Sequence, residues 1–190
     1  GLYDRVAHVV PEIEWPNPPP IADVSSDNLP SLVSGIRFEE VSTRVGIDFT
    51  YDRGETGEYW IVEPNGGGAA WVDFDLDGWF DLFFANGSPL KQPATTRVTD
   101  ALFRNLAGAM FLNVTQSAGV DGAGYGQGCV ASDYDDDVFP DLYVTNYGPN
   151  LLYRNNGDGT FSDVTRLARV ECDAFSTGAT FADLNGDAIL

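Results

Sequence analysis

The sequence DFDLDGWFDL, residues 73–82, places four aspartates at positions 1, 3, 5 and 9 of a loop and a glycine at position 6. Alternate spacing turns the first three carboxylates toward one point, and the glycine permits the sharp turn that returns the fourth. Two carboxylates roughly 5 Å apart repel each other by about 3 kcal/mol at an effective dielectric of about 20. The loop therefore predicts a bound divalent cation. Calcium fits best, because its flexible oxygen shell also accepts backbone carbonyls.

The same register returns twice further along the chain. DYDDDVFPDL, residues 133–142, repeats all four aspartates, and DLNGDAIL, residues 183–190, repeats the first three positions with asparagine as the second. The loops begin at residues 73, 133 and 183, and repeats of this length are typical of solenoids, propellers and arrays. The predicted calcium ligands are Asp73, Asp75, Asp77, the backbone carbonyl of Trp79 and Asp81; Asp133, Asp135, Asp137, the corresponding carbonyl of Phe139 and Asp141; and Asp183, Asn185 and Asp187.

The three loops differ at position 6. Gly78 occupies this position in the first loop, whereas Val138 and Ala188 occupy it in the other two. Those two turns must either tolerate a side chain or adopt another conformation. We therefore expect the first loop to bind calcium more tightly than the second.

From residue 35 onward the chain has the pattern of short strands separated by turn residues, with four strands in each repeat. Residues 155–159, NNGDG, predict a hairpin turn, and residues 88–99 contain the insertion that lengthens the first repeat. Residues 178–182 match the first strand of a repeat, and residues 38–42 match a last strand. The expected strands are 66–72, 81–85, 101–105 and 110–114 in the first repeat, and 128–132, 141–145, 151–155 and 160–165 in the second.

This pattern predicts an all-β fold of β-propeller blades, each a four-stranded antiparallel sheet, with blade boundaries near residues 115 and 165. Two to three blades are present where a closed ring needs at least about four, so the propeller is expected to be incomplete. A helical calcium hand is the rival explanation of the aspartate spacing. It fails because the flanking segments are β-branched and aromatic strands, and because no glutamate occupies loop position 12.

Composition excludes several classes of protein. Of the 190 residues, 43% are hydrophobic and 13% aromatic, so a folded core is expected rather than disorder. The net charge of −19 argues against nucleic acid and anionic membranes as partners and favours cations or basic ligands. No apolar run is long enough to span a membrane. His8 is the one histidine, which removes most zinc chemistry and most histidine-based catalysis.

Two features stand apart from the repeats. Residues 1–34 are rich in proline and predict an extended arm of polyproline character, whose apolar side chains favour docking over a free tail. The cysteines leave two alternatives open. Cys129 and Cys172 either form a disulfide, as in a secreted protein, or Cys129 is a small hydrophobic residue buried in a strand.

Residues 35–190, through the loops and flanks quoted above, resemble FG-GAP/VCBS-type repeats. Such repeats build integrin α-subunit propellers, and the closest resemblance is to the repeats of cartilage-acidic-protein-like secreted proteins. The resemblance implies a calcium-binding, usually seven-bladed propeller that is exported and acts as a secreted, extracellular or cell-surface protein. It also implies that the aspartates of the first two loops, together with Asp183, Asn185 and Asp187, bind calcium.

The function expected from these features is that of a non-catalytic extracellular module for adhesion, recognition or assembly, in which calcium has a structural role. The alternative is the scaffold portion of a secreted polysaccharide-cleaving enzyme. Candidate catalytic groups are Glu58, Tyr59, Glu63 and Arg104, but they form no recognisable nucleophile–base or acid pair in the sequence.

The expected partners are calcium ions and a protein or glycan ligand. Two to three blades leave one blade face and several strand edges open, and such surfaces drive association. We therefore expect this face to be covered either by further blades of a longer parent chain or by other copies of the chain, as a homo-oligomer or filament.

Overall fold

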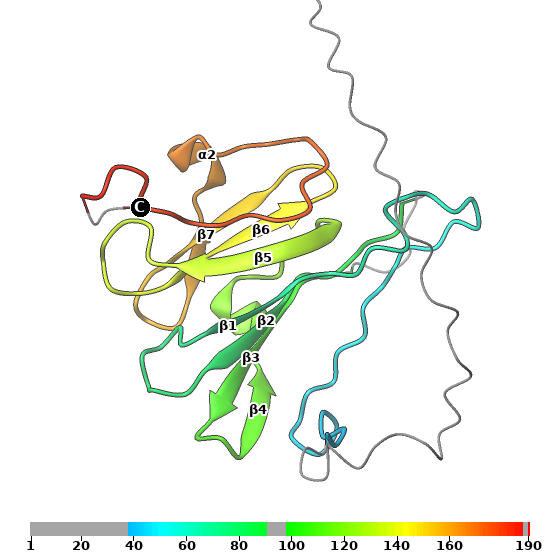
Figure 1. Ribbon diagram of the computed structural model, residues 1–190. Helices are drawn as coiled ribbons and strands as arrows, with labels where there is room; N and C mark the ends of the chain where they lie inside the picture. The colour runs from blue at the N-terminus through cyan, green and yellow to red at the C-terminus, as the bar shows by residue number, and fades with distance from the viewer. Residues whose placement is uncertain (1–37, 91–97, 188–189) are drawn as a thin grey trace, which may run out of the picture. The chain divides into compact units, whose positions relative to one another are not determined.

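Two four-stranded antiparallel sheets follow one another along the chain (Figure 1). The computed structural model describes residues 38–90, 98–187 and 190, so the predicted arm at 1–34 and part of the insertion at 88–99 lie outside the described residues. Each strand pairs with the next one in sequence, as in the blades that the repeats predict. The strands are β1 (Ala69–Val72), β2 (Asp81–Phe84), β3 (Ala101–Leu106) and β4 (Met110–Asn113) in the first sheet, and β5 (Gly126–Ser132), β6 (Asp141–Asn146), β7 (Leu151–Asn155) and β8 (Phe161–Asp163) in the second.

The main hydrophobic core joins the two sheets. Phe83 and Leu102 are paired neighbours on β2 and β3, and both are completely buried. They belong to one cluster with Leu142 and Val144 of β6, which are also completely buried. Full burial of each such side chain contributes about 1.5–3 kcal/mol relative to exposure. Packing between consecutive repeats is therefore a principal source of stability in this fold.

A smaller core covers the opposite face of the first sheet. Leu82 and Phe103 pack there against Ile47 and Phe49, which precede the first repeat. The ring of Phe49 stacks on that of Phe84, with centroids 4.6 Å apart and an interplanar angle of 14°. The prediction that residues 38–42 form a strand is wrong in the described part of this segment, because a turn at residues 42–46 follows instead. Ile47 and Phe49 cover the sheet with their side chains, and one backbone hydrogen bond, from the N–H of Phe111 on β4 to the carbonyl of Val45 at 2.6 Å, joins the segment to the sheet.

Each sheet ends in a short helical turn that the sequence analysis missed. The turns are α1 (Thr115–Ala118) and α2 (Thr165–Ala168), and the strands before them end at Asn113 and Asp163, earlier than predicted. Both threonine hydroxyls accept a hydrogen bond from a strand N–H of the same sheet, at 2.9 Å in each case. Side chains that bond the backbone in this way compete with a strand ladder. In the described part of the chain, no helix has the length and apolar character needed to cross a membrane.

The third repeat begins beside the second sheet, but it forms no strand. The predicted strand at residues 178–182 has no ladder, because no partner strand follows it within the described residues. This segment nevertheless lies alongside β5 (Figure 1), since a Cβ added at Gly128 would stand 3.5 Å from the Cα of Gly178. A Cβ at Gly68 would likewise stand 2.5 Å from the Cα of Gly128. Gly68, at the head of the first repeat, therefore permits the close approach of the second.

Neither cysteine forms a disulfide in the structure. Cys129 is half-buried and packs against the main core, and Cys172 is also a free thiol. The structure therefore agrees with the second alternative, in which Cys129 is a small hydrophobic residue in a strand, and not with a disulfide to Cys172.

Asn155 connects the two repeats through a buried hydrogen bond. Its side chain is completely buried, and its Nδ2 donates to the carbonyl of Phe74 in the preceding repeat at 2.8 Å. The equivalent Asn105 donates within its own repeat to the carbonyl of Phe80 at 2.9 Å. In both repeats the amide oxygen accepts an N–H from the following turn. The two asparagines thus differ mainly in the bond between repeats.

We predict that Asn155→Ala lowers the free energy of unfolding more than Asn105→Ala does, by about 1–3 kcal/mol, because it leaves the Phe74 carbonyl without its partner. Urea denaturation of the two variants and the wild type measures this difference. Equal losses in both variants would show that the bond between repeats adds no stability.

Candidate metal centres

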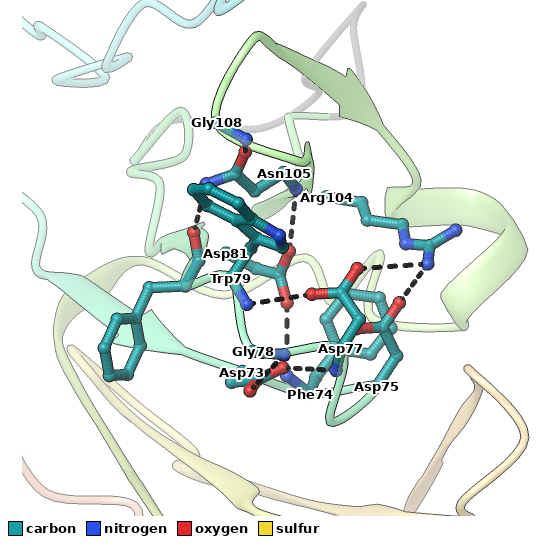
Figure 2. A network of polar contacts seen from close by, with 11 residues as sticks. Asp73, Phe74, Asp75, Asp77, Gly78, Trp79, Asp81, Arg104, Asn105 and Gly108 are labelled. Atoms are coloured by element: carbon teal, nitrogen blue, oxygen red, sulfur yellow. Dashed lines mark hydrogen bonds and ion pairs between the residues drawn. The ribbon is translucent and has the colours of Figure 1, made fainter.

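The first aspartate loop connects β1 to β2, and the second connects β5 to β6. In the first loop, Asp73 accepts backbone N–H bonds from Asp77 and Gly78, both at 3.0 Å, and Asp77 accepts one from Trp79 at 2.9 Å (Figure 2). The second loop repeats all three bonds at the equivalent positions, with lengths of 3.1, 2.7 and 3.0 Å. The aspartates thus wind the two loops into the same conformation.

The last aspartate of each loop anchors it to the sheet. Asp81 is completely buried and accepts N–H bonds from Phe74 in the loop, at 3.1 Å, and from Asn105 on β3, at 2.7 Å (Figure 2). Asp141 is also completely buried, and it accepts the equivalent bonds from Tyr134 and Asn155 at 2.9 and 2.8 Å. Each carboxylate therefore holds both the loop and the third strand of its sheet.

The structure brings three predicted ligands together in each complete loop. In each group, one carboxylate oxygen from every member lies within 4.8 Å of those of the others. The fourth aspartate, Asp77 or Asp137, stands outside the group and bonds to the N–H of Trp79 or Phe139. The role of the Trp79 and Phe139 carbonyls as ligands stays a prediction. The two groups are Asp73, Asp75 and Asp81, and Asp133, Asp135 and Asp141.

The third loop keeps the beginning of this conformation. Asp183 accepts N–H bonds from Asn185 at 3.1 Å and from Gly186 at 2.7 Å. The amide of Asn185 donates to Asp187 at 2.9 Å, so these two predicted ligands bond to each other. All three are exposed, in contrast to the anchored aspartates of the complete loops.

The loop backbone settles which conformation Val138 adopts. Gly78 and Val138 have φ angles of +87° and +80°, so the valine takes the same left-handed conformation as the glycine. Position 4 is also left-handed in all three loops, at Leu76, Asp136 and Gly186. A β-branched residue is strained in this region. The second loop therefore keeps its geometry against a local conformational penalty that the first loop avoids.

Burial and crowding favour protons on the anchoring carboxyls. The pKa of Asp81 is raised to about 6, chiefly by burial and also by the charges of Asp75 and Asp77, against the lowering effect of the two N–H donors. Burial likewise raises the pKa of Asp141 to about 6. The pKa of Asp135 is raised as well, first by burial and then by Asp137. A cation held at these oxygens would stabilise the ionised forms.

The donor set fits calcium. All the side chains in both groups offer carboxylate oxygens, which are the ligands that hard divalent cations prefer. In the first loop, Oδ1 of Asp75 is buried and has no hydrogen-bond partner, so an acceptor is left over for an ion. The second group offers the same three carboxylates, but its Asp135 is exposed.

The candidate catalytic residues do not form one site. Arg104 lies at the first metal loop, where its guanidinium forms ion pairs with Asp75 and Asp77 (Figure 2). Tyr59 and Glu63 line a different cavity, and the carboxylate of Glu63 accepts hydrogen bonds from Thr56. The sequence analysis did not predict the contact of Arg104 with the loop. The recurrence of an arginine at the same position in both repeats, as Arg104 and Arg154, was a signal that could have indicated it.

Comparison with known families gives a match to part of the chain. Residues 133–190 match the FG-GAP-like repeat family, in a range that starts at the first aspartate of the second loop and includes the third. Comparison with curated proteins gave no match. The first loop lies outside the matched range, and its likeness to the second is established by the shared hydrogen bonds.

We predict that, in excess chelator, Val138→Gly raises the free energy of unfolding by about 0.5–1 kcal/mol. The relief of backbone strain at this left-handed position exceeds the entropy that glycine adds to the unfolded chain. The matched variant Gly78→Val should be destabilised, because the space around Gly78 is open and only the backbone strain changes. Thermal unfolding in excess chelator tests both changes. A loss of stability in Val138→Gly would contradict the inference that Val138 is strained in its left-handed conformation.

A second prediction concerns pH. Since the folded-state pKa values of Asp81 and Asp141 are about 6, above the ordinary value of 3.8, these carboxyls stabilise the fold below about pH 4. This contribution is lost as the pH rises through 6. In chelator, the melting temperature should therefore fall between pH 4 and 7, and less steeply in the double variant Asp81→Asn/Asp141→Asn. An unchanged slope in that variant would assign the pH dependence to other groups.

Proposed function

We propose that this chain is a non-catalytic, calcium-stabilised β-propeller module that acts outside the cell in adhesion, recognition or assembly. The observation that carries the proposal is the pair of equivalent loops, each of which gathers three aspartates, one of them the buried anchor. The FG-GAP-like match over residues 133–190 supports the propeller-like architecture.

In the first site, calcium would be held by the carboxylates of the loop and by the Trp79 carbonyl. In the second, the equivalent groups would hold it. The ion supplies positive charge that offsets the repulsion among these carboxylates. Asp81 would connect the ion to the sheet, because its two oxygens also bind N–H groups of the loop and of β3. Asp141 would do the same in the second repeat.

A structural role for calcium is supported by how the anchoring carboxylates are engaged. Both oxygens of Asp81 and of Asp141 accept backbone N–H bonds, and both side chains are completely buried. Groups held in this way position a loop, whereas a catalytic acid or base must reach a substrate proton. We therefore assign the two sites to stability and not to chemistry.

A place outside the cell agrees with the character of the sites. Calcium-binding modules of extracellular proteins work with dissociation constants of about 10⁻⁴–10⁻³ M, which relatively open sites can supply. Several predicted ligands here are exposed, among them Asp77 and Asp137. The net charge of −19 also makes the fold sensitive to the cations around it.

An exposed apolar segment offers a contact for a ligand. Tyr59, Trp60 and Ile61 follow one another and are 92%, 50% and 76% exposed. The indole N–H of Trp60 donates to Glu58 at 3.0 Å, so the aromatic ring is held beside a carboxylate. Aromatic side chains with a polar handle are common in binding surfaces. We propose this segment as the contact with a protein or glycan.

We predict that isothermal titration calorimetry finds two bound calcium ions, whose affinity depends on the aspartates of the two complete loops. We also predict that calcium raises the melting temperature. At 100 times the dissociation constant, one ion adds about 2.7 kcal/mol of stability by mass action. Asp81→Ala and Asp141→Ala should each remove one ion, and the corresponding Asn variants should weaken binding less, because they keep one oxygen. Asp48→Asn, an exposed aspartate outside the loops, is the control. A melting temperature indifferent to calcium and chelator would refute the proposal.

A further inference from the structure

The two complete loops differ in the basic residue beside them. In the first, Nη2 of Arg104 lies 2.5 Å from Oδ2 of Asp75 and 3.4 Å from Oδ2 of Asp77 (Figure 2). The equivalent Arg154 acts on Asp135 only through longer-range electrostatics, and no ion pair joins it to a carboxylate among the residues that the structure describes. The same residue type at the same strand position therefore has two different arrangements.

We infer that Arg104 is a tethered cation that competes with calcium at the first loop, and that calcium transfers its guanidinium to Asp158 of the next repeat. The inference rests on the proposed calcium-binding function and concerns the regulation of the same site.

Competition follows from shared atoms and from charge. Asp75 and Asp77 are the predicted calcium ligands at positions 3 and 5, and one oxygen of each already faces the guanidinium. A divalent ion placed among these oxygens repels the guanidinium at short range. Calcium therefore has to displace Arg104 before it can use these oxygens of Asp75 and Asp77.

The ion pair is also incompletely satisfied. Nε of Arg104 and Oδ1 of Asp75 are buried and lack hydrogen-bond partners. A buried donor and acceptor without partners reduce the stability of the arrangement that contains them. The guanidinium is thus held at the loop by charge, but its position there can be exchanged for a better one.

Asp158 offers such a position. Arg104, Asp75 and Asp158 line one cavity of about 550 Å³ between the first loop and the β7–β8 hairpin. Asp158 accepts two hydrogen bonds from Thr160, both at Oδ1, which leaves its second oxygen for a guanidinium. This hairpin belongs to the second repeat. Movement of Arg104 would therefore replace an ion pair within one repeat by an ion pair between two repeats.

Trp79 allows the first loop to be followed separately. Its ring packs against the turn at Gly108, where an added Cβ would come within 2.7 Å of it, and the second loop has Phe139 in its place. A calcium-dependent change in tryptophan fluorescence that is absent from the Trp79→Phe variant therefore reports on the first loop. Isothermal titration of the same samples reports on both loops.

The decisive experiment titrates the full chain with calcium and compares Arg104→Met with Arg154→Met. We expect Arg104→Met to raise the calcium affinity of the first loop about two- to fivefold, the range set by exposed ion pairs. Arg154→Met should change the affinity of the second loop less, since it breaks no close ion pair. Equal gains in both variants would indicate a general charge effect and overturn the competition. So would an unchanged affinity in Arg104→Met.

Asp158→Asn tests where the guanidinium goes. It should lower calcium affinity at the first loop in the wild type, and this effect should vanish in the Arg104→Met background, as a double-mutant cycle measures. Equal effects in both backgrounds would overturn the transfer to Asp158. The proposed function fails separately, if neither loop binds calcium in any variant. If both loops bind calcium but Arg104→Met does not change the affinity, the inference is overturned and the proposed function stands.

Discussion

Repulsion among carboxylates that are held close together is the constraint to which the rest of the structure responds. Each complete loop collects its aspartates at the end of a strand and buries one of them beneath the others. Without compensation, such a group favours protonation, as the pKa of about 6 at Asp81 and Asp141 indicates. Backbone N–H groups compensate part of this charge, and a bound cation would compensate the remainder. The charge of each loop is therefore linked to the sheet beside it, because the buried aspartate also accepts an N–H bond from the third strand.

Packing between repeats ties these loops to the whole fold. The main core contains residues of both sheets, and Asn155 reaches from the second sheet to the carbonyl of Phe74, inside the first loop. Asp141 accepts the N–H of the same Asn155. One asparagine is therefore bonded to the anchor of its own loop and to the backbone of the preceding loop. Both candidate metal centres are therefore linked to the interface between repeats through the hydrogen bonds of this one residue.

The repeats made most of the architecture predictable from the sequence. Strand starts at Asp81 and Asp141 follow from the loop register, because the last predicted ligand is also the first residue of the next strand. The helical turns at Thr115 and Thr165 could not be read in this way, since their threonines bond to a strand that is distant in sequence. The contact of Arg104 with the first loop was missed for a related reason. Arg104 and Arg154 occupy the same position in their repeats, so only the residues around them in the fold distinguish them.

A similar difference between surroundings appears at the start of the third strands. Asp100 and Asn150 are equivalent, and each accepts an N–H bond at 2.8 Å, from Asn86 and Asn146 respectively. The amide of Asn150 donates to Tyr143 and Ser176, whereas Oδ2 of Asp100 is buried without a partner.

Burial raises the pKa of Asp100 to about 7 and so favours its protonated form, whereas the equivalent Asn150 carries an amide that donates hydrogen bonds. Each repeat therefore keeps the hydrogen bond that shapes its backbone, while the other half of the same side chain adapts to its neighbours. The two complete aspartate loops follow the same rule, because the same hydrogen bonds form both loops, whereas Arg104 forms ion pairs with the first loop alone among the residues that the structure describes.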